Sequence, residues 1–433
     1  MGTFIFLIAV VVEIAFVVFC IITKSYQQKV RSIIRITAFA VFVLFTILPI
    51  IDWSFRYYTL ASFLLLLAVM GAVALIRKKE EKRTYKTVRV VLKAIVMTVL
   101  IFMLTLSAII FPQYKAMKPT GKYQVATVNY TYTDTKRIET YTNSGKNRKL
   151  NVEMWYPKNS DGTYPLIVFS HGSFGTKSSN TSLYNELASH GYVVCSIDHT
   201  YQCLFTTDMD GHTTFMDMGY MKEISNENAH IDKQQSYEFY QKWMDIRTGD
   251  INFVMDYILA EVKNNDADTV YKLMDTTKMG AIGHSLGGSA VLGIGRMRDD
   301  VSAVIALESP FMCDIEGVKG GEFVFTDEKY PVPVLNVYSD QGWNLLPNGL
   351  QYAENYALLS AANATAFNIH IKGAGHLTLC DLALESPYLT RKLNGQKSTT
   401  DTKYCLKTIN MVCLEFFNCY LKGEGKFKSA GSY

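Results

Sequence analysis

Five residues about two thirds of the way along the chain, Gly283-His284-Ser285-Leu286-Gly287, have the spacing of a nucleophilic serine on a tight turn. A serine hydroxyl attacks a carbonyl carbon only if it is exposed and a base lies beside it. Glycines two positions before and after Ser285 remove side chains that would crowd such a turn. An apolar run, residues 279–282, precedes the serine, and a run of small and apolar residues, 289–296, follows it. The pattern predicts a strand, a turn that carries Ser285, and a helix, whereas the bare motif alone also fits an ordinary glycine-rich turn.

Ser285 needs a histidine as its general base, and two of the eight histidines follow it in the chain. Where a serine occupies a strand-to-helix turn of this kind, the base comes later in the sequence than the nucleophile. His370 lies inside an apolar run, residues 367–371, and is explained as a packed residue of a strand. His376 follows Gly373-Ala374-Gly375, a loop that can carry an imidazole over the serine. We therefore expect His376 to be the base.

A carboxylate must hold the histidine in the correct orientation, and two acidic residues can do so. Glu308 follows the predicted strand 301–307, and Asp340 follows the next predicted strand, 332–338. Both would lie at the same edge of a sheet, where either could accept the Nδ1 proton of His376. Position alone slightly favours Asp340, and the residues leave both possibilities open.

Backbone amides are expected to stabilise the oxyanion that forms when Ser285 attacks a carbonyl. One is the amide of Leu286, and the other comes from the loop 170–175, whose glycines allow its amides to turn inward. Ser173 or Phe174 would supply this second amide. The chemistry requires no metal and no cofactor.

The elements that must position these residues follow a recognisable order. Three predicted strands with polar turns come first, at residues 125–133, 137–142 and 149–156. Short apolar runs then alternate with helical stretches, and these runs lie at residues 166–169, 192–197, 279–282, 301–307, 332–338 and 366–371. Near-continuous apolar strands alternating with helices predict a mostly parallel sheet covered on both faces. An antiparallel start followed by a parallel body is the plan of the α/β-hydrolase fold.

An irregular segment, residues 200–231, interrupts this alternation. It is polar but carries methionines and aromatic residues, and it lies between a predicted strand and a long predicted helix. An insertion at the carboxyl end of a parallel strand can cover the site as a lid, although an ordinary surface loop fits equally well. Four apolar residues could line an acyl slot beside the serine: Phe174, Phe205, Phe215 and Met216.

The first quarter of the chain has a different composition. It contains four apolar blocks, at about residues 3–22, 36–51, 59–76 and 94–111. Each is about long enough to cross a bilayer as a helix, and none has the amphipathic face that a soluble bundle needs. We therefore expect a membrane region over residues 1–114, followed by an α/β-hydrolase domain over residues 115–433.

Basic residues around the blocks predict the orientation of the chain in the membrane. They gather between the first and second blocks and between the third and fourth, at Lys24, Lys29, Arg31, Arg35, Arg77, Lys78, Lys79, Lys82, Arg83, Lys86, Arg89 and Lys93. The positive-inside rule makes these two loops cytoplasmic, so both termini and the catalytic domain face outward, most simply from the plasma membrane. The net charge of +4 then reflects topology and does not indicate a nucleic-acid partner.

Glu13 lies inside the first apolar block, where a charge is costly. It is explained either by a bond to another helix or by a function within the membrane, and we favour the first explanation.

Several matching segments together make the chain similar to a known family. They are Trp155-Tyr156-Pro157, Ser170-His171-Gly172, Glu186 to Tyr192, Gly283 to Gly288, Ile305 to Glu308, and Gly373 to His376. From about residue 152 to residue 381 the chain resembles the plasma-type platelet-activating factor acetylhydrolases and, more broadly, dienelactone-hydrolase-like esterases. The resemblance implies Glu308 as the acid and the amides of Ser173 and Leu286 as oxyanion donors. Two features depart from the family plan: Glu308-Ser309-Pro310 stands where the family has Asp and, two residues on, Trp, and four membrane spans precede the domain.

These observations predict a membrane-anchored serine esterase that acts through an acyl-enzyme. The resemblance implies short-acyl or oxidised phospholipids as substrates. The four apolar blocks make the lipid bilayer the other expected partner. A surface acyltransferase with the same triad and a non-catalytic hydrolase-like membrane protein are the alternatives. The sequence does not indicate the oligomeric state.

Overall fold

The computed structural model describes residues 1–77, 84–360, 365–395 and 398–433. Of the basic residues expected to face the cytoplasm, Lys78, Lys79, Lys82 and Arg83 lie outside these ranges. The chain divides into two compact units. The first contains Met1–Lys115 with Leu384–Leu389, and the second contains Ala116–Ala383 with Thr390–Tyr433.

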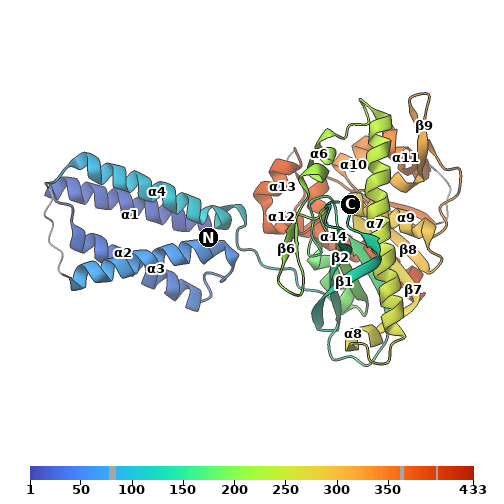
Figure 1. The fold of residues 1–433 in the computed structure, drawn as a ribbon, viewed down its shortest axis with the longest axis horizontal. Coiled ribbons are helices and arrows are strands. Elements are labelled where there is room, and N and C mark those ends of the chain that lie inside the picture. Colours follow the sequence, from blue (N-terminus) through green and yellow to red (C-terminus); the bar gives the residue numbers. More distant parts are fainter. Residues whose placement is uncertain (78–83, 361–364, 396–397) are drawn as a thin grey trace. The chain divides into compact units, whose positions relative to one another are not determined.

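The first unit contains four long helices (Figure 1): α1 (Gly2–Thr23), α2 (Gln28–Ile47), α3 (Phe55–Ile76) and α4 (Thr87–Ile110). All four are long enough and apolar enough to cross a membrane. α1 packs along α4, and α2 packs along α3. Many of their large apolar side chains are exposed.

The helices in this unit differ from the apolar blocks at their ends. α2 begins at Gln28 and α4 at Thr87, so both include basic residues that apolarity alone excludes. Lysine and arginine are good helix formers, so a helix continues through them where an apolar block ends. α2 also ends earlier than expected, at Ile47, because Pro49 follows.

The second unit is built on a nine-stranded sheet with the order β1-β2-β4-β3-β7-β8-β11-β12-β13. These strands are Val125–Ile138, Asn147–Pro157, Val193–Asp198, Tyr164–Ser170, Met274–His284, Val301–Leu307, Val334–Ser339, Ala366–Ile371 and Gly431–Ser432, in that order. β1 and β2 pair antiparallel, β2 pairs antiparallel with β4, and every later pair is parallel. The sheet therefore has the antiparallel start and the parallel body that the sequence predicts.

Helices cover both faces of this sheet. α7 (Lys233–Val262) and α9 (Leu286–Met297) pack together on one face, and α5 (Thr181–Ser189) and α14 (Thr402–Phe417) pack together on the other. The shorter helices are α6 (Met218–Asn226), α8 (Thr269–Lys272), α10 (Asp340–Leu345), α11 (Ala353–Ser360), α12 (Leu382–Glu385) and α13 (Pro387–Leu393). The largest core cluster lies between the sheet and the α7 and α9 layer. The predicted α/β class is confirmed.

One predicted pair of strands forms a single strand. The sequence indicates strands at 125–133 and 137–142, but β1 continues from Val125 to Ile138 and residues 139–142 lie outside it. The polar stretch between the two expected strands stays in the sheet because β1 lies at its edge, where one side of the strand faces solvent and polar residues are tolerated.

The irregular segment 200–231, called the insertion below, has its own secondary structure. It contains a hairpin of β5 (Phe205–Thr207) and β6 (Thr213–Phe215), followed by α6. Its Tyr220 side chain is fully buried. A second hairpin, β9 (Ile315–Lys319) and β10 (Glu322–Phe325), follows β8.

Candidate active site

Ser285 lies on the turn between β7 and α9, in a backbone conformation that few residues adopt. Its φ is 54° and its ψ is −127°. The turn is held from both sides, since the Ser285 amide donates to the Leu307 carbonyl at 2.9 Å and the Ser289 amide donates to the Ser285 carbonyl at 3.1 Å. A non-glycine residue at positive φ stores strain, which the surrounding structure must offset. Strain of this kind is found where a side chain must be presented at a site.

The glycines around Ser285 are required by close backbone contacts. A Cβ atom on Gly283 would collide with the Gly287 backbone, and one on Gly287 would collide with the Ser170 backbone at the end of β3. The start of α9 therefore lies directly against the end of β3. This contact brings the serine turn and the loop after β3 together.

His376 and Glu308 form a hydrogen-bonded pair at the carboxyl edge of the sheet. The His376 Nδ1 atom lies 2.9 Å from Glu308 Oε1, and the Glu308 side chain is only 2% exposed. The other oxygen, Oε2, accepts a 2.6 Å hydrogen bond from the Ser339 amide at the end of β11. Burial raises the pKa of the Glu308 carboxyl, but the hydrogen bonds from His376 and Ser339 outweigh this effect and hold its pKa below the usual value. Glu308 is therefore an ionised acceptor for the histidine.

The histidine loop also contacts the residue that precedes the serine. The His284 and His376 rings lie 4.7 Å apart, and His284 Nε2 lies 3.2 Å from the His376 carbonyl oxygen. His284 comes immediately before Ser285, so the contact fixes the loop after β12 against the serine turn. Burial, together with the nearby His376 ring, lowers the pKa of His284 to about 3, which keeps its ring neutral.

Asp340, the alternative acid, belongs to a different pair. Its Oδ1 lies 2.7 Å from His370 Nε2, and its Oδ2 accepts a 2.8 Å hydrogen bond from the Gly373 amide. The Asp340 amide donates to the Ala374 carbonyl at 3.1 Å. Asp340 therefore shapes the loop that leads to His376, while Glu308 contacts the His376 ring.

The loop after β3, residues 170–175, lies against the serine turn as expected. A Cβ atom on Gly172 would lie 3.1 Å from the Ser285 Cβ atom. Phe174 in the same loop has a φ of 63°, another strained non-glycine position. In the described residues, the amides of Ser173 and Leu286 donate no hydrogen bond to another protein group. Both amides can therefore donate a hydrogen bond to a ligand oxygen without breaking an existing bond.

The insertion rests on this loop. The Leu204 amide donates to the Gly175 carbonyl at 3.1 Å, and the hydroxyls of Tyr220 and Ser173 lie 3.0 Å apart. Of the four residues expected to line an acyl slot, Phe174, Phe205 and Phe215 are exposed by 37%, 46% and 69%. Phe205 and Phe215 pair across the β5–β6 hairpin, whereas Met216 is partly buried and packs on the core.

A buried arginine on α7 supports the loop 170–175. The Arg247 side chain, on α7, is fully buried and donates to the His171 carbonyl and, at 2.7 Å, to Gln202 Oε1. His171 Nδ1 lies 2.7 Å from the Gly172 carbonyl, and the His199 amide donates to His171 Nε2 at 3.2 Å. Arg247 thus ties α7, the loop and the insertion together, and His171 braces the loop.

A second part of this support is an ion network around Asp250. Asp250 accepts hydrogen bonds from Arg148 at 2.6 and 2.7 Å, and its Oδ2 lies 2.9 Å from His199 Nδ1. His199 Nε2 lies 2.8 Å from the Ser170 hydroxyl, which begins the loop. Burial raises the pKa of Asp250, but Arg148 and His199 lower it far more, so Asp250 stays charged. The sequence does not predict this network, because its members lie on separate elements. Within α7 the local signal is the pair Arg247 and Asp250, three residues apart on one buried helix face.

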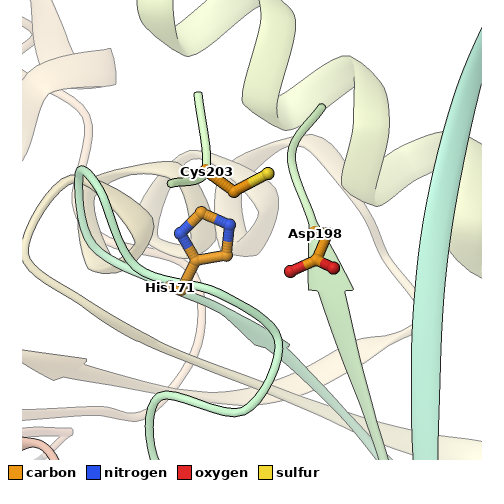
Figure 2. A group of neighbouring side chains, drawn as sticks. All are labelled: His171, Asp198 and Cys203. Atoms are coloured by element: carbon orange, nitrogen blue, oxygen red, sulfur yellow. The ribbon is translucent and has the colours of Figure 1, made fainter. Parts of the chain in front are cut away.

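Three buried side chains in this region, His171, Asp198 and Cys203, lie close enough to suggest a metal site (Figure 2). Their potential ligand atoms all lie within 4.8 Å of one another. However, Asp198 already accepts from the Lys177 amide, from Lys177 Nζ at 3.0 Å and from the Thr206 hydroxyl at 2.6 Å. Both ring nitrogens of His171 are engaged, and burial raises the pKa of the Cys203 thiol. The donor set therefore fits a hydrogen-bonded brace better than a cation site.

Taken together, the strained serine after a central parallel strand, the histidine after the last long strand and the loop amides define the class of α/β-hydrolases. The sequence profile of the family described as platelet-activating factor acetylhydrolase, isoform II, matches residues 114–431, and the chain belongs to that family.

Individual relatives agree with this assignment. The platelet-activating factor acetylhydrolase of Cavia porcellus is 22% identical over 277 residues, which cover 63% of this chain and 61% of the relative. Cutinase est1 of Thermobifida alba is 27% identical over 154 residues, covering 36% of this chain and 38% of the relative. The chain thus spans less than two thirds of the length of each. By their names these relatives are carboxylic ester hydrolases.

A solved structure, a ferulic acid esterase from Streptomyces cinnamoneus, shares the fold. Its TM-score is 0.55 at 19% sequence identity, with 71% of this chain and 93% of that chain covered. At this level of identity the likeness concerns the fold alone.

The neutral, buried His284 predicts a pH dependence of stability. Its pKa is about 3 in the folded chain and about 6.5 in the unfolded chain, so between these values the unfolded chain binds one more proton. The free energy of unfolding therefore falls as the pH is lowered below about 6.5, by about 1.4 kcal/mol per pH unit from this group. The free energy of unfolding can be measured by urea titration of tryptophan fluorescence on the full chain in detergent, at pH 5.5 and 4.5. Between these two pH values it should fall less for His284→Gln than for the wild type. His230→Gln, at an exposed position, is the control and should follow the wild type, and an equal fall in the wild type and His284→Gln would refute the assignment.

Proposed function

We propose that the chain is a membrane-anchored serine esterase in which Ser285, His376 and Glu308 form the catalytic triad. The observation that carries this proposal is the hydrogen bond between His376 Nδ1 and the buried Glu308 carboxylate, 2.9 Å long, next to the strained serine turn. A histidine held at Nδ1 by an ionised carboxylate has its Nε2 lone pair available to accept a proton.

In the proposed reaction, the Ser285 hydroxyl attacks the ester carbonyl carbon while His376 Nε2 takes the hydroxyl proton. The carbonyl oxygen becomes an oxyanion, which the amides of Leu286 and Ser173 stabilise. His376 then gives the proton to the leaving alcohol, and the C–O bond breaks to leave an acyl-serine. A water molecule then attacks the acyl carbonyl while His376 Nε2 takes its proton. His376 returns this proton to the Ser285 oxygen as the acyl–serine bond breaks, so the acid leaves and Ser285 is restored.

The family and its relatives support esters as the substrate class. Within that class, we propose short-acyl or oxidised phospholipids, since the family is described as platelet-activating factor acetylhydrolase. Phe174 in the loop after β3, with Phe205 and Phe215 on the adjacent insertion, would provide apolar contacts for an acyl chain. Met216 packs on the core and contributes less to such a surface.

Replacing Ser285 tests the catalytic proposal. Ser285→Ala should lower the turnover of p-nitrophenyl acetate by at least about 10³-fold and abolish labelling by a fluorophosphonate probe, because no other group replaces the nucleophile. Ser289→Ala, one turn further along α9, is the matched control and should keep both properties. Undiminished turnover in Ser285→Ala would rule out the proposed mechanism.

The membrane part of the proposal rests on α1 to α4 and on the basic residues near their ends. We propose that the loop between α1 and α2 and the loop between α3 and α4 are cytoplasmic, and that both termini and the second unit lie outside the plasma membrane.

Site-directed labelling tests this orientation. Cysteines introduced at the exposed positions Lys428 and Lys86 would be compared in a background that carries Cys313→Ser and Cys419→Ser. A membrane-impermeant maleimide should label Lys428→Cys on intact cells, and Lys86→Cys only after permeabilisation. The reverse pattern would invert the orientation, and labelling of both on intact cells would refute it.

A further inference from the structure

A cavity of about 430 Å³ lies among the four helices of the first unit. Its walls are apolar and come from all four helices, including Phe16, Phe42, Leu60 and Ile101. This volume falls within the range of about 300–1,000 Å³ that is typical of ligand sites, which combine apolar walls with a few charged groups. Here the charged groups are Glu13, Arg31 and Arg35.

These three charges do not cancel. Glu13 Oε2 and Arg31 Nη2 form an ion pair of 3.3 Å, and both side chains are less than one fifth exposed. Arg35 lies one turn further along α2, and within residues 1–77 and the rest of the described chain it makes neither a hydrogen bond nor an ion pair. The cavity therefore carries one positive charge more than it carries negative charges.

A charge beside an apolar cavity within a spanning helix is costly unless a partner is present. The partner must bring a negative group to Arg35 and apolar chains to the walls. Arg35 follows Gln28, the first residue of α2, by seven residues, or about 10 Å along the axis, so its long side chain can reach toward the head-group region. Basic pockets between spanning helices at the cytoplasmic side are known to bind anionic lipid head groups.

We propose that this cavity binds one anionic phospholipid, with its head-group phosphate at Arg35 and an acyl chain along the apolar walls. Glu13 pairs with Arg31 and lies close enough to act on Arg35 as well, so it offsets one of the two positive charges. A zwitterionic lipid would bring its own positive group to Arg35 and bind less well. The site does not depend on ester hydrolysis, since none of its residues belongs to the second unit.

Lipid retention by the purified full chain tests this proposal. Native mass spectrometry in a mild detergent would compare added dioleoyl-phosphatidylglycerol with dioleoyl-phosphatidylcholine. We expect at least about fivefold more of the anionic lipid to stay bound, and Arg35→Gln to reduce it to the level of the zwitterionic lipid. Arg35→Lys should keep most of the binding. Lys29→Gln removes an exposed cation from the first turn of the same helix, outside the cavity, and should have little effect.

A second variant changes binding in the opposite direction, which guards against misfolding of Arg35→Gln. Glu13→Gln frees Arg31 and should increase retention of the anionic lipid. Equal retention of the two lipids, an equal effect of Arg35→Gln and Lys29→Gln, or a decrease in Glu13→Gln would each overturn the proposal. Oleate added together with dioleoyl-phosphatidylglycerol provides a further comparison. If the chain retains oleate in place of the phospholipid, the assignment of the cavity to a phospholipid is overturned.

Discussion

The buried carboxylate of Glu308 is the interaction on which the candidate site depends. A charge that is only 2% exposed is unfavourable unless it is hydrogen-bonded, and its two oxygens meet the Ser339 amide and the His376 ring. These contacts join the end of β8 to the end of β11 and to the loop after β12. Gly342 completes the enclosure, since a Cβ atom there would lie 2.6 Å from the Glu308 carboxyl carbon. The Glu308 charge thus orients the His376 ring, while His284 and Asp340 hold the loop that carries it.

Backbone strain is a second feature of the candidate site. Ser285, Phe174 and Glu308 all have positive φ values, at 54°, 63° and 51°, although none is glycine. Each such position costs about 1–3 kcal/mol and persists only where the surrounding structure holds it. The buried arginines provide part of that support, since Arg247 binds the loop after β3 and Arg148 pairs with Asp250 beneath it. The site is therefore held by packing and ion pairs that belong to the fold.

Some of this arrangement could be predicted from the sequence, because local patterns encode it. The glycines around Ser285 and the alternation of apolar runs with helices indicated the serine turn and the fold class. The choice between Glu308 and Asp340 could not follow from strand ends alone, since β8 and β11 are neighbours and both acids lie at the same edge. Tertiary contacts distinguish the two acids, because Asp340 contacts His370 whereas Glu308 contacts His376. The Asp250 network escaped prediction for the same reason, because its partners lie far apart in the chain.

The most direct test of this account compares the two carboxylates. Glu308→Gln should lower kcat for a p-nitrophenyl ester by about 10³- to 10⁴-fold, because the amide can no longer stabilise the protonated His376 ring. Asp340→Asn should lower kcat by less than about tenfold, since Asp340 shapes the loop without contacting that ring. A large loss in Asp340→Asn together with near-normal turnover in Glu308→Gln would contradict the central role of the Glu308–His376 pair.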